Sequence, residues 1–510
     1  MKVVIRADAS IEMGIGHVMR CLTLADVLKN HGAEISFICR EHKGNLIHYI
    51  EEKSYLVYRL DSHFSDTNIA DKLDNSPLAH ASWLGSTQKE DAEACDSILQ
   101  TIIPDWLIVD HYAIDYRWQM KLKKHYKSLM VIDDLADRKH ECDLLLDQTF
   151  GRKTDDYNKQ IPKNCILILG AQYALLRPEF SKWRKYSLQR RSTSELENIL
   201  INMGGIDRDN VTGQVLGILK TCVFPEKLTV TVILGAASPN IESVKKLAVM
   251  MPIKTEVKIN VNNMAELMAN ADLAIGAAGA TTWERCCLGL PSIQIVIADN
   301  QRFVAKNLTK ANVIQFAENL TDLPSLLNDT VKKIRKLSLL SSSVTDGTGG
   351  DEIYNCLISN SSINEKVTLK PVGIDDCKYM YSLQTTEARK FSRNSSKPIW
   401  KAHVNWFKKI MNEDSSVLFV IMLSQKFVGM LRLDNIDETE IEISIIVSPD
   451  HSGQGIAKKT LKQAFELQPD RCFKAVINKN NIKSQLVFEK IGFTRVRELT
   501  DFLQYASSKC

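Results

Sequence analysis

A histidine follows a glycine loop at the point where a helix is expected to begin. The segment Gly14-Ile15-Gly16-His17-Val18-Met19-Arg20 lies after a short apolar strand at 3–5 and opens an amphipathic run that extends to Leu28. A strand, a glycine loop and a helix together present backbone N–H groups to an anion. The partial positive charge of a helix N-terminus disfavours imidazolium, so we expect His17 to be neutral near pH 7 and able to accept a proton. The loop alone leaves two interpretations open: an active-site base, or a turn with a capping or packed histidine.

Two further glycine-rich loops follow later strands. The apolar stretch 198–203 ends in Gly204-Gly205, and the stretch 271–275 runs into Gly276-Ala277-Ala278-Gly279-Ala280-Thr281-Thr282-Trp283-Glu284. Small residues and threonines at a helix start allow close approach of a phosphate, and a carboxylate one turn later suits ribose hydroxyls. The D-x-D triplet at 207–209 has the form of a metal–nucleotide site, but acids beside a helix start are usually caps, and a cap is the favoured interpretation.

A fourth loop, Ser452-Gly453-Gln454-Gly455-Ile456-Ala457, follows an alternating strand at 441–447 and precedes a helix at 458–467. Consecutive backbone amides at such a helix start can bind a pyrophosphate. Each of these loops needs a strand before it and a helix after it, so the chemistry depends on α/β units.

The elements alternate accordingly. Apolar strands at 33–39, 106–110 and 129–134 end in polar loops and are separated by helical stretches, which predicts a doubly wound α/β domain with ligands at the carboxyl ends of the strands. Asp110, Tyr112, Asp133 and Asp134 are expected there, with a helix cap as the favoured alternative for Asp134. Changes in composition predict domains at 1–190, 191–357 and 367–510, with a linker at 358–366.

Composition narrows the classes of function. The chain has 510 residues and a net charge of +4, from 65 basic and 61 acidic residues, which is too little to indicate a nucleic-acid or membrane surface. No segment approaches the roughly 18 apolar residues that span a bilayer. The 12 cysteines are dispersed without a C-x-x-C motif, so we expect reduced thiols in a cytoplasmic enzyme, with neither a zinc site nor a disulfide framework.

The stretch from Val367 to Leu503 resembles GNAT-type N-acetyltransferases, by its V-x-P turn, its glycine loop and the ending Phe488-Glu489-Lys490-Ile491-Gly492-Phe493. The resemblance implies an α+β domain that uses acetyl-CoA. It assigns the pyrophosphate to the amides of Gln454, Gly455, Ile456 and Ala457, the pantetheine arm to Val447, and a further cofactor contact to Asn481. The segment His403-Val404-Asn405-Trp406-Phe407 is similar to members that acetylate amino groups on nucleotide-linked sugars.

This stretch departs from the GNAT pattern at two positions. Ser452 replaces the usual leading Arg or Gln of the loop, and Phe488 replaces a tyrosine often used as general acid. Amides perform most of the cofactor binding, so binding is expected to survive both changes. Glu442 is a candidate general base, with a solvated strand glutamate as the equal alternative.

The first 355 or so residues resemble the UDP-2,4-diacetamido-2,4,6-trideoxy-β-L-altropyranose hydrolases of pseudaminic acid biosynthesis. An ordered series of motifs carries the resemblance: R-A-D, G-I-G-H-V-M-R, V-D-H-Y, I-D-D, C-D-L-L-L-D-Q, Y-A-L-L-R-P-E-F, M-G-G-I-D and D-N-Q. It implies two Rossmann-like domains in a GT-B arrangement. The family's catalytic histidine falls on His17, and substrate-binding roles fall on Gly16, Tyr112, Arg177, Glu284 and Asn300.

The resemblance predicts hydrolysis of a UDP-sugar at its anomeric carbon without a metal. His17 takes a proton from the attacking water, and Gly204, Gly205, Gly279 and Thr281 hold the diphosphate. The GNAT domain would acetylate the 4-amino group of the same UDP-sugar one step earlier. The alternative is a GT-B glycosyltransferase with a UDP-sugar donor, in which the GNAT region is a non-catalytic binding module.

Overall fold

The computed structural model describes residues 1–61, 78–192, 195–298, 301–359, 366–423, 426–436 and 439–510. The chain divides into two compact units. The first combines Met1–Arg177 with Gly347–Ile363, and the second combines Pro178–Asp346 with Asn364–Cys510. The grouping places the helix at 178–191 in the second unit, whereas the sequence predicts a boundary after residue 190.

The first unit is built on a seven-stranded parallel sheet in the order β3-β2-β1-β4-β5-β6-β7. Successive residues of a strand point to opposite faces, so Val3 and Ile5 enter one apolar core and Val4 enters the other. Both faces are buried, as the continuous apolar runs of the strands predict. The strands are β1 Lys2–Ala7, β2 Glu34–Arg40, β3 Leu56–Leu60, β4 Trp106–Asp110, β5 Ser128–Ile132, β6 Leu144–Asp147 and β7 Ile166–Leu169.

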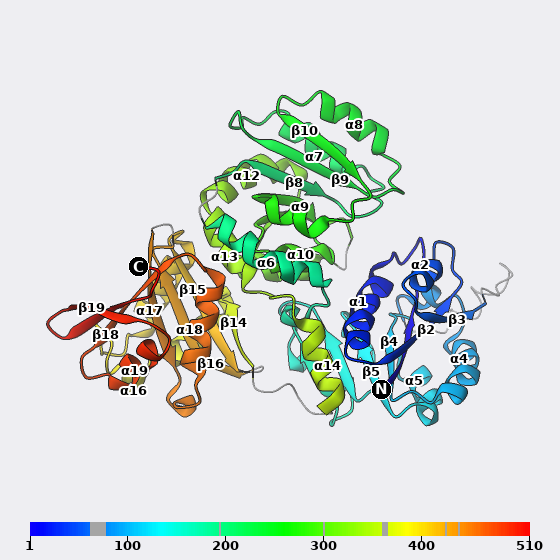
Figure 1. Ribbon diagram of the computed structural model, residues 1–510, viewed down its shortest axis with the longest axis horizontal. Coiled ribbons are helices and arrows are strands. Elements are labelled where there is room, and N and C mark those ends of the chain that lie inside the picture. Colours follow the sequence, from blue (N-terminus) through cyan, green and yellow to red (C-terminus); the bar gives the residue numbers. More distant parts are fainter. Residues whose placement is uncertain (62–77, 193–194, 299–300, 360–365, 424–425, 437–438) are drawn as a thin grey trace. The chain divides into compact units, whose positions relative to one another are not determined.

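Helices cover both faces of this sheet. Figure 1 shows α1 and α14 together on one face, where Ile353 and Leu357 of α14 share a core with Val18 of α1. On the other face, α4 begins with a capping box between Thr87 and Glu90. The helices are α1 Gly16–Asn30, α2 Ile47–Glu52, α4 Gln88–Ile102, α5 Tyr116–Leu122 and α14 Gly349–Ser359, and a short 3-10 helix, η1, covers Ala81–Leu84.

The second unit begins with a six-stranded parallel sheet in the order β10-β9-β8-β11-β12-β13. Its strands are β8 Asn198–Asn202, β9 Thr229–Leu234, β10 Lys254–Ile259, β11 Leu273–Ala277, β12 Ser292–Ile295 and β13 Gln315–Ala317. Its helices are α6 Pro178–Arg191, α7 Val211–Leu219, α8 Ile241–Val249, α9 Met264–Asn270, α10 Thr281–Cys287, α11 Gln301–Lys310, α12 Leu323–Lys332 and α13 Ile334–Ser342.

A third, mixed sheet follows in the order β14-β15-β16-β17-β18-β20-β19. Its strands are β14 Val367–Pro371, β15 Ser416–Leu423, β16 Lys426–Asp434, β17 Glu440–Val447, β18 Cys472–Asn478, β19 Thr494–Glu498 and β20 Phe502–Ala506. Its helices are α15 Cys377–Ser382, α16 Thr386–Arg389, α17 Trp400–Asn412, α18 Ile456–Leu467 and α19 Ile482–Lys490. Two parallel α/β sheets followed by a mixed α+β domain confirm the predicted fold class.

One prediction about the cysteines is wrong. Cys472, at the start of β18, forms a disulfide with Cys510. The cause is topological: β20 runs antiparallel beside β18 and returns the chain end to it, with a Cα–Cα distance of 4.7 Å. The other ten cysteines are free.

Candidate functional sites

His17 is held by a buried carboxylate of the neighbouring strand. It is the second residue of α1, and its Nδ1 lies 2.6 Å from Oδ1 of Asp110, the last residue of β4. Asp110 has no exposed surface. A carboxylate on Nδ1 fixes the imidazole orientation and, in the neutral ring, leaves the lone pair on Nε2. The arrangement therefore suits a general base.

Arg20, one turn after His17, fixes the same carboxylate. Its Nε lies 2.6 Å and its Nη2 2.7 Å from the two Asp110 oxygens, and its Nη1 donates to Asp134. Burial alone raises the pKa of Asp110, but the Arg20 charge and the hydrogen bonds with Arg20 and His17 lower that pKa well below its usual range. Asp134 is thus an ion-pair partner, and the helix cap favoured from the sequence is wrong.

Aromatic rings surround His17. The Tyr112 ring meets it edge-on at 4.5 Å between centroids, and its hydroxyl donates to Asp134 Oδ2 at 3.0 Å. Trp83 of η1 stacks on Tyr112 at 5.9 Å and lies 6.4 Å from His17. His80 contacts Trp83 at 4.5 Å. Flat apolar rings beside a base form a wall against which a sugar ring can lie.

A buried charge network explains the R-A-D motif. Arg6 has no exposed surface and donates to Asp8 at 2.6 Å and to Asp91 at 2.8 Å. Asp8 also lies 3.4 Å from Nε2 of His111, and His111 Nδ1 accepts the backbone N–H of Ala113 at 3.1 Å. The network fixes the turn that carries Tyr112, directly after His111.

A second acidic cluster lies at the ends of β5 and β6. The Tyr157 hydroxyl donates to Asp147 at 2.8 Å and to Asp133 at 3.1 Å, and Asp147 also accepts from Arg152. Burial, together with the nearby charge of Asp134, raises the pKa of Asp147 to about 6. The Asp147 carboxyl therefore changes charge near pH 6, and it does so close enough to Asp134 for the two charges to interact.

The predicted phosphate loop after β8 has a glycine conformation. Gly204 adopts a φ of +95°, which favours glycine. The amides of the helix that follows are already occupied, because Asp207 accepts from Val211 at 2.8 Å and from Thr212 at 3.0 Å. Asp207 is thus a cap, as favoured from the sequence, and any phosphate contact must come from Gly204 and Gly205 rather than from the first amides of α7.

The remaining predicted residues of the first two domains lie on separate segments. Gly279 and Thr281 are partly exposed around the start of α10, and Glu284 lies within that helix. Arg285 is buried below them and donates to the Ala277 carbonyl at 2.6 Å. Arg177 is the last residue of its segment in the first unit, and Asn300 lies outside the described residues. Roles for these residues stay predictions.

The loop before α18 is open to an anion. Gly453 and Gly455 have φ values of +83° and +75°, and a Cβ on either would meet no atom within 4 Å in the part of the chain that the structure describes. Gly455 precedes Ile456, and no side chain of the described residues caps this helix. Two left-handed glycines therefore present the amides of Gln454, Gly455, Ile456 and Ala457 without an obstructing side chain.

Strands β17 and β18 part beside this loop. They pair in parallel only from Glu440–Cys472 to Glu442–Lys474, although both strands continue for several residues. Val447, the last residue of β17, lies on the parted segment. Backbone groups on the inner edge of such a split can pair with an extended ligand.

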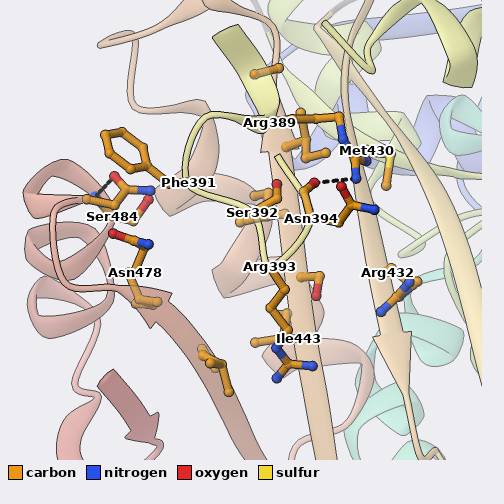
Figure 2. A pocket seen from close by; sticks show the side chains of 18 of the residues that line it. Arg389, Phe391, Ser392, Arg393, Asn394, Met430, Arg432, Ile443, Asn478 and Ser484 are labelled. Carbon is orange, nitrogen blue, oxygen red and sulfur yellow. Dashed lines mark hydrogen bonds between the residues drawn. The ribbon is translucent and has the colours of Figure 1, made fainter. Parts of the chain in front are cut away.

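A cavity of about 530 Å³ extends over the split strands (Figure 2). Ile445, Ile446 and Ile477 supply apolar wall, and Glu442 and His403 supply titratable groups; burial lowers the pKa of His403. Asn481 and Phe488 of α19 line the cavity too. The Asn481 side chain caps its own helix by accepting from Ser484 at 3.2 Å, so only its other amide group remains for a ligand.

The sequence reasoning missed several of these residues. Arg20 stands three residues after His17, a helical spacing that places both on one face, so this signal was readable. Trp83 and His80 follow a stretch without a motif and meet His17 only through the tertiary fold. Arg393, which lines the cavity and pairs with Glu442 at 3.0 Å, lies in a loop between helices and carries no sequence signature.

Two stretches of the chain match known domain families. Residues 366–494 match the Acetyltransferase (GNAT) domain family, and residues 220–345 match the Glycosyltransferase family 28 C-terminal domain. The structure is similar to that of MurG from Acinetobacter baumannii, with a TM-score of 0.52 and 15% identity over 70% of this chain and 99% of that one. The chain joins a GT-B, glycosyltransferase-28-like part to a GNAT acetyltransferase domain.

One relative is similar over nearly the whole chain, and another is similar over the GT-B part. An uncharacterized protein of Methanocaldococcus jannaschii is 25% identical over 98% of both chains. A UDP-2,4-diacetamido-2,4,6-trideoxy-beta-L-altropyranose hydrolase of Campylobacter jejuni is 27% identical over 61% of this chain and 97% of its own length. The GT-B part is thus similar to nucleotide-sugar enzymes. In the part of the chain that the structure describes, no helix is long and apolar enough to cross a membrane.

The GNAT domain implies acetyl-CoA, and the residues present fit it. The uncapped α18 amides suit the pyrophosphate, and the split edge of β17 at Val447 suits the pantetheine arm. When bound, acetyl-CoA supplies a thioester carbonyl that an amine can attack. Glu442 and His403 line the cavity, and a carboxylate or an imidazole can serve as a base there.

Proposed function

We propose that the GT-B part hydrolyses UDP-2,4-diacetamido-2,4,6-trideoxy-β-L-altropyranose at its anomeric carbon. The observation that carries the proposal is the His17–Asp110 contact of 2.6 Å, in a segment similar along nearly its whole length to a hydrolase of that name. Asp110 orients the ring, and Nε2 of His17 takes a proton from water as the water attacks C1. UDP leaves from the opposite face, with inversion.

The other site residues complete this proposal. Gly16 lets the backbone approach the sugar, and Tyr112 and Arg177, with Asn300, orient its acetamido groups or the water. Gly204, Gly205, Gly279 and Thr281 stabilise the departing diphosphate, and Glu284 binds the ribose hydroxyls. No metal takes part.

We further propose that the GNAT domain acetylates the 4-amino group of the precursor UDP-sugar. An open loop for a pyrophosphate, and a cavity over the split strands that is lined by the titratable side chains of Glu442 and His403, support catalysis rather than ligand binding alone. The two reactions then follow one another on one chain.

The match to the glycosyltransferase 28 domain favours a second candidate, transfer of the sugar to a hydroxyl acceptor. Incubation of the full chain with the diacetamido UDP-sugar in H₂¹⁸O, without an acceptor, separates the two. Hydrolysis at C1 gives equal amounts of UDP and free sugar, with the label in the sugar and the inverted anomer seen first by NMR. An absolute requirement for an acceptor would refute hydrolysis.

The acetyl-transfer step needs its own experiment. The UDP-linked 4-amino sugar and acetyl-CoA should give free CoA and a new acetamide signal, followed by UDP release. Calorimetry that shows acetyl-CoA binding without turnover of this amine would instead identify a binding module.

A further inference from the structure

The cavity of the GNAT domain contains an ion pair between a strand glutamate and a loop arginine. Nη2 of Arg393 lies 3.0 Å from Oε1 of Glu442, and both residues line the cavity. Figure 2 shows Arg393 extending from its loop over the strand that carries Ile443. The Arg393 side chain is 61% exposed and that of Glu442 is 30% exposed. An ion pair this open to water contributes little to stability, so it can exchange partners at low cost.

The loop that carries Arg393 is held in place by another arginine. Arg389 donates from Nε to the Ser396 carbonyl at 2.9 Å, and it also donates to the Asn394 carbonyl and to the buried side chain of Gln384. Both carbonyls follow Arg393 and Arg389 precedes it, so these bonds close the loop around Arg393. The Arg393 side chain can therefore change partner while its loop remains in place.

Glu442 sits where a cation is needed. In the antiparallel ladder it stands opposite Asp434, and in the parallel ladder it stands beside Lys474. Asp434 is itself paired with Arg432 at 2.7 Å, and the Lys474 amine donates to Glu440. Like charges directly opposite one another are unfavourable, and Arg393 offsets this at Glu442. A substrate ammonium can take over that role.

We propose that the Arg393–Glu442 pair is a recognition device for an acceptor with two opposite charges, an ammonium group and a phosphate or diphosphate. Glu442 exchanges Arg393 for the substrate ammonium, and the released guanidinium binds the phosphate oxygens, a geometry that arginine favours. The inference rests on the proposed acetyl transfer and identifies the residues that select a nucleotide-linked amine over a free one.

Acetyl transfer at this site needs a base for the ammonium and a proton for the leaving thiolate. Glu442 takes one proton from the ammonium, and the neutral amine attacks the thioester carbonyl. The C–N bond forms, the C–S bond breaks, and the second amine proton passes to the thiolate to give free CoA. Glu442 returns its proton to water. Phe488 has no proton to give, so this route does not use the tyrosine of related enzymes.

Two acceptors test the device: the UDP-linked 4-amino sugar and the same amino sugar without UDP. In the full chain, Arg393→Gln should raise KM for the UDP-linked amine about 10- to 100-fold and change kcat little, because a charge-assisted contact is lost. The kcat/KM for the free amino sugar should stay within about twofold of the wild type. Lys397→Gln, which removes a cation from the same loop, is the matched control and should leave both acceptors unchanged.

Glu442→Gln should lower kcat about 100-fold or more with both acceptors, because it removes the base, and Glu442→Asp should restore part of the loss. Equal effects of Arg393→Gln on the two acceptors, at an unchanged melting temperature, would overturn the inference. The wild type decides the proposed function separately: if it does not acetylate the UDP-linked amine, acetyl transfer to that substrate fails before the variants are compared.

Discussion

The His17 region and the Glu442 region both pair a titratable side chain with an opposite charge, but they do so differently. Asp110 is fully buried and is bonded to both His17 and Arg20. Glu442 and Arg393 are partly exposed, and one of the two stands on a loop. The first is a fixed network, and the second is a single contact that water reaches.

The difference matches the demands of the two proposed reactions. A base that activates water must be oriented before the substrate arrives, because its nucleophile brings no binding energy of its own. A base that acts on an ammonium can be oriented by the substrate itself.

His17→Asn should abolish hydrolysis of the UDP-sugar, with a loss of about 10³-fold or more in kcat, because no other base replaces Nε2. UDP affinity by calorimetry and acetyl transfer by CoA release should both remain near wild type. His48→Asn, at an exposed histidine of α2, is the control. Substantial hydrolysis by the His17 variant would refute the general-base role.

Asp110→Asn should lower the hydrolytic kcat by about 10²-fold, because the neutral amide no longer fixes the His17 ring and leaves Arg20 with less compensation. The melting temperature of the GT-B part should also fall. Asp137→Asn, at a carboxylate closer to the surface, should change neither property. A wild-type rate in the Asp110 variant would show that the network is structural only.

Salt should separate the two regions. Raising NaCl from about 0.05 to about 0.5 M shortens the screening length and weakens exposed charges more than buried ones. The KM of the UDP-linked amine in acetyl transfer should rise about 3- to 5-fold, whereas the hydrolytic kcat at saturating substrate should change by less than about twofold. Initial rates in both assays measure this, and an equal response would contradict the contrast.

The smallest effect concerns the pH dependence of the first unit. The pKa of Asp147 is raised to about 6, so between about pH 4 and 6 the folded state binds more protons than the unfolded chain. The free energy of unfolding of the first unit should therefore fall as the pH rises through this window. Asp147→Asn should flatten that dependence by on the order of 1–3 kcal/mol, measured by hydrogen exchange in β6. The exposed Asp155→Asn should leave the slope unchanged.

The fold was accessible from the sequence because its strands are short apolar runs that end in glycine or acidic loops. β4, β8 and β17 were all predicted within a residue or two, and each is followed by the loop that the pattern required. The disulfide was not accessible, since no spacing shows that β20 brings residue 510 back to Cys472.

The candidate sites were accessible where chemistry is local. The loop made His17 a candidate base, the resemblance assigned it the catalytic role, and Asp207 was favoured as a cap from its place before a helix. The wall of Trp83 and Tyr112 and the pair of Arg393 and Glu442 were not, because they join segments whose contact depends on tertiary packing. Motifs therefore identify one partner of each site, and packing supplies the other.

Helix α14 has a consequence for how the chain is made. The Leu357 carbonyl of this helix accepts a hydrogen bond from the indole N–H of Trp106, and Tyr354 stacks on His31. The ribosome must therefore finish the intervening sheet before the first core can close, a delay of roughly ten to thirty seconds at about 5–20 residues per second. During that interval the apolar face of α1 and β1 is uncovered. A chain that stops before residue 347 should expose this face, and the nascent N-terminal unit is the expected client for chaperones.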